Sequence, residues 1–167
     1  MPTPAEAGRS STRAIRKYRE GDLECLKDIV RDVFGPGSID FHLERHFGLV
    51  AGMSWQERKV RHLEWDLAAE GGAIFVSERK GRVIGFITVV LDIEAKIGRM
   101  VNLAVARECQ DRGVAHQLIE RGLEYMTESG MAVAKIETLD GNHKGEHIFP
   151  SMGFKEVARQ IHYFKKL

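Results

Sequence analysis

The segment from Gln110 to Ala115, QDRGVA, combines residue types that suit the binding of a phosphate group. A glycine at the point where a loop becomes a helix lets the backbone approach a ligand closely. The first N–H groups of the helix are unpaired and lie at the positive end of its dipole, so they form an anion site. Arg112 adds a guanidinium group suited to phosphate. The segment therefore predicts a pyrophosphate held at the start of a helix.

Two elements must position this loop, and the hydrophobic pattern predicts both of them. Before the loop, Val101, Leu103 and Val105 alternate with other residues, which is the period of a strand over 97–105. After the loop, apolar residues recur at i, i+3, i+4, i+7 and i+11, which is the stripe of an amphipathic helix. These residues are Ala115, Leu118, Ile119, Gly122 and Met126. The loop is therefore predicted to join a strand to a helix that ends near Ser129-Gly130.

A second group of residues with informative spacing lies nearer the C-terminus, in the pattern Asn142-x-x-Gly145-x-x-x-Phe149-x-x-x-Gly153-Phe154. On a helix, positions 142, 145, 146 and 149 share one face, so Asn142 and Phe149 would face the same ligand. A small residue at position 145 would leave room for that ligand. The pattern is also compatible with an ordinary capped helix whose Phe149 packs in the core.

Taken in this order, the two motifs resemble the acyl-CoA-binding segments of the GNAT superfamily of N-acetyltransferases. The resemblance covers nearly the whole chain after residue 12 and implies acetyl-CoA as cosubstrate. Main-chain groups of residues 103–105 would bond the pantetheine and the acyl carbonyl, and N–H groups of residues 111–116 would hold the pyrophosphate. The implied cofactor-binding residues are Leu103, Ala104, Val105, Gln110, Asp111, Arg112, Gly113, Val114, Ala115, His116, Asn142 and Phe149.

The resemblance also implies a reaction, in which a primary amine attacks the thioester directly in a ternary complex. The amine belongs to a peptide N-terminus, a lysine or a small molecule. Because an ammonium has no lone pair, a base must first take its proton. In the subgroup that acetylates protein N-termini, a glutamate at the place of Glu137 does this through water. Glu137 is therefore the expected catalytic base, although it would also fit as a surface carboxylate; Asp92 and Glu94 are weaker candidates.

One departure from the family pattern leaves the protonation of the leaving group open. The family usually has a tyrosine where this chain has Phe149, and that tyrosine protonates the departing CoA thiolate. Water would then supply the proton, or Ser151 if its geometry allows. The alternative is a non-catalytic CoA-binding regulatory module, and a plain structural domain is the third interpretation.

The composition limits the binding partners and the cellular compartment that we expect for this chain. The 167 residues have a formal net charge of +1, so no strong field favours nucleic acid or an anionic membrane. Cys25 and Cys109 are expected to be reduced thiols of a cytoplasmic protein, with an acyl-enzyme at Cys109 as a minor alternative. His143 and His147 have a spacing that can chelate metal, but without further ligands no metal is expected. A homodimer stays open, because the superfamily often dimerises.

The expected fold class is α/β, with a mixed, mostly antiparallel twisted sheet flanked by helices, as in the GNAT fold. Residues 1–12 are expected to be a disordered tail and residues 13–167 a single domain. The expected strands near the C-terminus are 132–139 and a closing antiparallel pair, 153–157 with 160–164. The region between Gly35 and Gly72, which contains His42, His46 and His62, is expected to form the acceptor side of the cleft.

Overall fold

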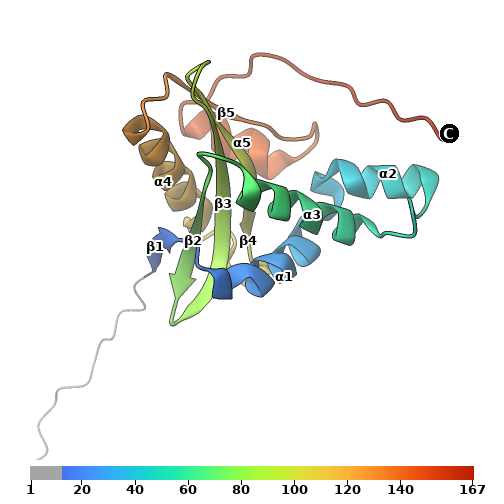
Figure 1. Ribbon diagram of the computed structural model, residues 1–167, viewed down its shortest axis with the longest axis horizontal. Coiled ribbons are helices and arrows are strands. Elements are labelled where there is room, and N and C mark those ends of the chain that lie inside the picture. The colour runs from blue at the N-terminus through green and yellow to red at the C-terminus, as the bar shows by residue number, and fades with distance from the viewer. Residues whose placement is uncertain (1–12) are drawn as a thin grey trace, which may run out of the picture.

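The computed structural model describes residues 13–167 as a five-stranded sheet with helices on both faces (Figure 1). The expected tail, residues 1–12, lies outside the described residues. Neighbouring strands from β1 to β4 are antiparallel, and β5 is parallel to β4. In order across the sheet, the strands are β1 (Ala14–Lys17), β2 (Ala73–Arg79), β3 (Arg82–Asp92), β4 (Ile97–Val105) and β5 (Val133–Ile136). The expected mixed α/β class is confirmed.

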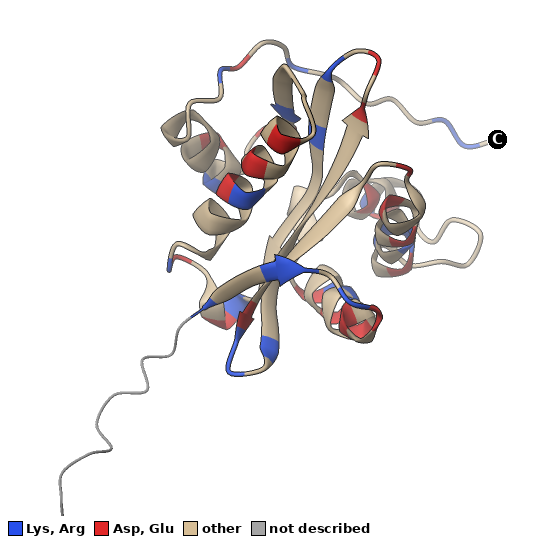
Figure 2. Cartoon of the chain, turned by 60° about the vertical axis from the view of Figure 1, so that its left-hand side comes forward, with Lys and Arg blue, Asp and Glu red and all other residues tan. Residues whose placement is uncertain are grey.

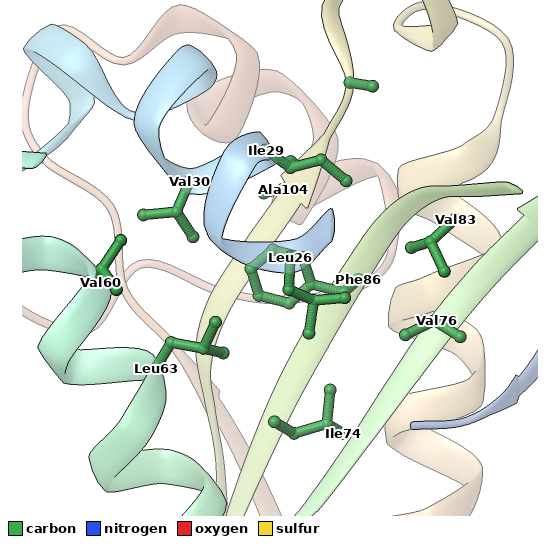
Figure 3. Close-up of a cluster of buried hydrophobic side chains, with 11 residues drawn as sticks. Leu26, Ile29, Val30, Val60, Leu63, Ile74, Val76, Val83, Phe86 and Ala104 are labelled. Atoms are coloured by element: carbon green, nitrogen blue, oxygen red, sulfur yellow. The ribbon is translucent and has the colours of Figure 1, made fainter. Parts of the chain in front are cut away.

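Helices α1 (Leu23–Val33) and α3 (Trp55–Ala68) cover one face of the sheet. Their apolar stripes meet side chains of β2, β3 and β4 in one buried cluster (Figure 3). Phe86 of β3 lies in this cluster and is fully buried. Helix α2 (Ile39–Phe47) packs beside α3. Its Ser38 cap accepts a hydrogen bond from the amide of Phe41, in a segment where the sequence pattern had not predicted a helix.

Helix α4 (Val114–Glu128) covers the opposite face, and α5 (His143–Ser151) joins the same apolar cluster. The predicted stripe of α4 is buried at Leu118, Ile119, Gly122 and Met126. A side chain at Gly122 would place its Cβ atom 3.0 Å from Met100 of β4. The glycine therefore allows α4 to lie close to the sheet, which fixes the position of the loop at the start of the helix.

Strand β4 contains an irregularity in the middle of its pairing with β3. Thr88 pairs with Asn102 and Val89 pairs with Met100, so Val101 is an extra residue, 45% exposed. This β-bulge interrupts the alternation predicted for Val101, Leu103 and Val105. Met100 faces the α4 cluster, whereas Asn102 faces the α3 side of the sheet.

The predicted closing pair of strands, 153–157 with 160–164, is wrong. From Phe154 onward the backbone is extended and leaves the sheet, and it pairs with no other strand of the described chain (Figure 1). An alternating pattern gives strand propensity, but a strand also needs a neighbouring edge for its N–H and C=O groups. Strand β5 is likewise shorter than the predicted 132–139, since its pairing with β4 ends at Met100 and Ile136.

Within residues 13–167, no helix is both long enough and apolar enough to cross a membrane.

Candidate functional site

The loop before α4 has the backbone shape that an anion site requires. Asp111 and Gly113 both have positive φ, 58° and 77°. Gly113 is the N-cap of α4, and no described side chain caps this helix or places a carboxylate in its first turn. The first amides of α4 therefore have no capping side chain among the described residues. A side chain at position 113 would point into open space rather than into protein.

Gln110 and Lys144 hold this loop in place. The Gln110 side-chain amide donates a hydrogen bond of 2.9 Å to the carbonyl of Val105, which ties the loop to the end of β4. Lys144 of α5 donates to the Gln110 side-chain oxygen at 2.8 Å and pairs with Asp111 at 3.3 Å. The structure thus uses the Gln110 side chain to brace the loop, a role that the spacing alone did not reveal.

Arginine side chains add positive charge next to the start of α4. A cavity of about 240 Å³ is lined by Arg13, Arg79 and Arg112 together with Ile84, Cys109 and Val114. In Figure 2, the ribbon is blue at Lys and Arg positions on β1 and at the turn between β2 and β3. Arg112 and His116 are exposed. Three guanidinium groups beside uncapped amides form a surface that attracts phosphate.

Strands β4 and β5 separate in the region where the acyl end of acetyl-CoA is expected to bind. Their parallel pairing ends at Met100 and Ile136, but β4 continues to Val105. The β5-facing edge of residues 101–105 therefore lies beyond the parallel pairing. Ala104 and Val105 have buried side chains and Leu103 is half-buried, so what this edge offers a ligand is its main chain.

Helix α5 contacts both the segment after β5 and the loop before α4. Asn142 is its N-cap, and the Asn142 side-chain amide donates to the Thr138 hydroxyl at 2.8 Å. A Cβ atom at Gly145 would lie 2.7 Å from the same hydroxyl, so this glycine allows a close approach between α5 and the end of β5. Phe149 packs in the α4 cluster, with its ring centroid 6.2 Å from that of Phe154. Asn142 and Phe149 thus hold α5 in place beside the gap.

The structure places the predicted base, Glu137, directly after β5. Its side chain is 68% exposed and pairs with Lys135 at 2.7 Å. Ala134 and Ile136 pack against the α4 cluster, so Lys135 lies on the other face of β5, the face that α1 and α3 cover on the neighbouring strands. The weaker candidates, Asp92 and Glu94, lie at the turn between β3 and β4, where Asp92 accepts a hydrogen bond from the amide of Ala95.

A set of residues that the sequence analysis missed lies on the α3 side of β4. We call Lys59, Asp66, Thr88 and Asn102 the α3–β4 polar cluster. Lys59 donates to the Asn102 side-chain oxygen at 2.7 Å, and the Asn102 side-chain amide donates to Asp66. The Thr88 hydroxyl donates to Asp66 at 2.8 Å and accepts from the Asn102 backbone amide at 2.9 Å. Asn102 is thus held between a cationic and an anionic side chain of one helix.

Burial shifts the ionisation of this cluster. Burial raises the pKa of the Asp66 carboxyl, and the hydrogen bonds from Thr88 and Asn102 oppose this rise. Burial also lowers the pKa of the Lys59 ammonium, which lies 4.5 Å from the ring centre of Phe34. His62, one turn after Lys59, has its pKa lowered by burial as well. One sequence feature could have indicated this cluster. Lys59, His62 and Asp66 are spaced i, i+3 and i+7, so they share one face of α3 beside its apolar stripe.

The other candidate groups are buried or have partners within the protein. Cys109 is 3% exposed and packs within the α4 cluster. His143 pairs with Glu146 at 3.3 Å. Among residues 13–167, no three His, Cys, Asp or Glu side chains are grouped as metal ligands. The Ser151 hydroxyl donates to the carbonyl of Ile148.

Comparison with known proteins connects this geometry to one family. Residues 33–154 match the family model described as the acetyltransferase (GNAT) family. An uncharacterized N-acetyltransferase of Archaeoglobus fulgidus is 24% identical over 145 residues, which cover 83% of this chain and 92% of the relative. The structure resembles that of the aminoglycoside N-acetyltransferase AAC(6')-Iy in complex with CoA, with a TM-score of 0.71 at 20% identity over 97% of this chain and 100% of the other. The PaiA N-acetyltransferase of Thermoplasma acidophilum in complex with coenzyme A gives a TM-score of 0.70 at 16% identity over 89% and 93% of the two chains.

Proposed function

The chain belongs to the GNAT family of acetyltransferases, and on this premise we propose that it moves an acetyl group from acetyl-CoA to a primary amine. The observation that carries the proposal is the uncapped start of α4 beside the edge of β4 that β5 leaves unpaired. The first feature suits a pyrophosphate, and the second suits a pantetheine chain that needs main-chain partners. Two related folds were solved in complex with CoA, which supports the same cosubstrate here.

In this proposal, amides of residues 111–116 hold the pyrophosphate, with Arg112 adding charge. Main-chain groups of Leu103, Ala104 and Val105 bond the pantetheine and the acyl carbonyl. An amide directed at the carbonyl oxygen stabilises the negative charge that develops there during attack. Asn142 and Phe149 border the channel from α5. The acetyl group passes by direct attack in a ternary complex, without an acyl-enzyme.

The acceptor amine is proposed to approach from the α3 side of the sheet, because Lys135 lies on that face and pairs with the proposed base. Glu137 is the proposed base, acting through water. Glu137 first takes one proton from the ammonium through water, and the free amine nitrogen then bonds to the acetyl carbon. As the C–S bond breaks, the second proton that the nitrogen loses passes through water to the CoA thiolate. The Glu137 side chain is 68% exposed, so water can reach its carboxylate.

The test measures release of the CoA thiol from acetyl-CoA in the presence of a panel of amines. The panel contains a peptide with a free N-terminus, a lysine peptide with a blocked N-terminus, a polyamine and an aminoglycoside. We expect saturable release that depends on one or more of these amines. Tight binding of CoA without release from any amine would instead favour the regulatory module, and the absence of CoA binding would contradict both functions.

We also propose that two copies form a homodimer through the C-terminal arm, defined as residues 155–167. Val157 is 94% exposed, Ile161 73% and Tyr163 88%, which is unfavourable for a chain in water. The outer edge of β5 carries no further strand of the described chain, so it can accept a strand from a second copy. The arm has 13 residues and spans at most about 45 Å when extended, enough to reach a neighbouring sheet.

Light scattering after size-exclusion chromatography tests this proposal. The full chain should elute as a dimer, and a chain that ends at Phe154 should elute as a folded monomer. A monomeric full chain would overturn the homodimer. A dimer that survives the truncation would remove the arm from the interface.

A further inference from the structure

The α3–β4 polar cluster is an unusual feature of the sheet, because stability alone does not explain it. Its neighbours on the same face, Phe86 and Ala104, are buried and apolar. Within the described chain, Asn102 rather than a direct ion pair joins Lys59 to Asp66. Removing charged groups from water costs hydration free energy, and such indirect contacts recover only part of it. Apolar side chains of similar volume often stabilise a core equally well. The cluster therefore indicates a function.

The position of the cluster suggests which function. Asn102 is the residue immediately before Leu103, where the proposed reaction places the acyl carbonyl. The bulge at Val101 turns the Asn102 side chain to the α3 side, toward Lys59 and Asp66. An amine that attacks the carbonyl from this side approaches the part of β4 where Asn102 contacts Lys59 and Asp66 of α3. Asp66 is the carboxylate joined to this part of β4 through both Thr88 and Asn102.

We propose that Asp66 binds the protonated amine of the acceptor and holds it against the acyl carbonyl at Leu103. This inference rests on the proposed function and adds the residue that recognises the acceptor. Asp66 is then a binding residue, while Glu137 remains the proposed base. Thr88 and Asn102 fix the orientation of the carboxylate, and only one of its oxygens accepts hydrogen bonds from them. A carboxylate held in this way gives a charge-assisted hydrogen bond to an ammonium.

Several charged groups set the ionisation of Asp66 at this place. Lys59 and His62 lie on the same helix and lower the pKa of Asp66, whereas burial raises it. Asp40 of α2 acts on Lys59 and His62, and its carboxylate lies 3.7 Å from His62. Burial is the largest of these influences, so Lys59 and His62 compensate the negative charge of Asp66 only in part. The ammonium of an acceptor would add the positive charge that is missing. Amine binding should therefore weaken as Asp66 becomes protonated at lower pH.

The first experiment compares Asp66→Asn with wild-type protein, using the amine from the panel with the highest kcat/KM. Asparagine keeps the shape and one acceptor oxygen but removes the charge. We expect the KM for the amine to rise on the order of 10-fold to 100-fold, and the KM for acetyl-CoA to change less than about twofold. Asp22→Asn is the matched control, because Asp22 is a buried carboxylate that accepts hydrogen bonds from Arg16 and from the amide of Arg19, far from the cleft. It should lower stability and leave both KM values unchanged.

A second variant gives a result that a purely structural role would not produce. Thr88→Val removes the hydroxyl that donates to Asp66 and so raises the pKa of that carboxyl further. On acidification, the KM for the amine should therefore begin to rise at a higher pH in this variant than in wild-type protein. Circular dichroism and CoA binding verify that both variants are folded.

The results test the role of Asp66 and the proposed function separately. If wild-type protein acetylates an amine but Asp66→Asn leaves the KM for that amine unchanged, the role of Asp66 is overturned and the proposed function stands. Equal changes in the KM values of both substrates would also overturn it, as would a pH profile of Thr88→Val identical to that of wild-type protein. If wild-type protein releases no CoA with any amine, the proposed function itself fails.

Discussion

The donor side and the acceptor side of β4 are built in different ways. On the donor side, the amides proposed to hold the pyrophosphate come from one continuous loop and the first turn of α4, residues 111–116. On the acceptor side, the α3–β4 polar cluster draws Lys59 and Asp66 from α3, Thr88 from β3 and Asn102 from β4. The donor side offers mainly backbone, and the acceptor side offers side chains.

This difference has a physical consequence. Backbone amides at a helix start exist whatever the side chains are, so the donor side depends on φ values such as that of Gly113. The acceptor side depends on the identity of each side chain and on the bulge that turns Asn102 toward α3. We therefore expect donor-side substitutions to act through shape and charge at the loop, and acceptor-side substitutions to change amine recognition.

The largest expected effect comes from Glu137→Gln, which tests whether the base belongs to the acceptor side. Removing a general base should lower turnover by about 100-fold or more, with CoA affinity nearly unchanged. Steady-state thiol release measures the first quantity, and calorimetric titration with CoA measures the second. Glu124→Gln is the control, because Glu124 is likewise an exposed carboxylate paired with a basic side chain, Arg121 of α4. An unchanged rate in Glu137→Gln would remove this residue from the mechanism.

The donor side could be predicted from the sequence because its determinants are local. Gly113 and the apolar stripe from Leu118 to Met126 fix a helix start and a buried face, and the structure confirms both. Strand β4, predicted at 97–105, also has these bounds. In each case the hydrophobic period and the loop residues are visible within one short window.

On the acceptor side, the contacts of the α3–β4 polar cluster could not be predicted, because they join residues far apart in the chain. Lys59 and Asn102 are separated by 43 positions, and no local pattern indicates that they meet. The bulge at Val101 is also a property of the pairing with β3 rather than of β4 alone. The wrong closing pair at the C-terminus has the same origin, since an alternating pattern does not specify which edge it will join.

The second prediction tests the donor side, with Gly113→Glu. The new side chain would enter the open space before α4 and place a negative charge where the pyrophosphate is proposed to bind. Affinity for CoA should fall on the order of 10-fold to 100-fold, as measured by titration. Gly130→Glu is a close control, because Gly130 follows the other end of α4, has a φ of 76° and also faces open space. A loss of affinity that is equal in both variants would contradict the loop as the anion site.

The third prediction concerns Phe149→Tyr, which tests whether the donor side lacks a hydroxyl that protonates the CoA thiolate. If the CoA thiolate leaves next to Phe149, a hydroxyl there should raise turnover several-fold by supplying a proton. Phe154→Tyr serves as the control, since Phe154 packs against Phe149 in the same cluster. No gain at position 149, or an equal gain at both positions, would indicate that protonation of the thiolate does not limit the reaction.

The smallest expected effect is the pH dependence of stability that Asp66 causes on the acceptor side. Because burial raises the pKa of Asp66 in the folded chain, the folded state keeps this proton at pH values where the unfolded chain, with an aspartate pKa of about 3.9, has lost it. This carboxyl therefore lowers the free energy of unfolding as pH rises from about 4 through its raised pKa. The other titrating groups are shared with Asp66→Asn, so the stability of wild-type protein should fall relative to that variant over this interval. Urea denaturation of both proteins between about pH 4 and 7 measures the difference. A difference that is constant with pH would mean that Asp66 is as well solvated as an exposed carboxylate. The acceptor side would then differ from the donor side only in its hydrogen bonds.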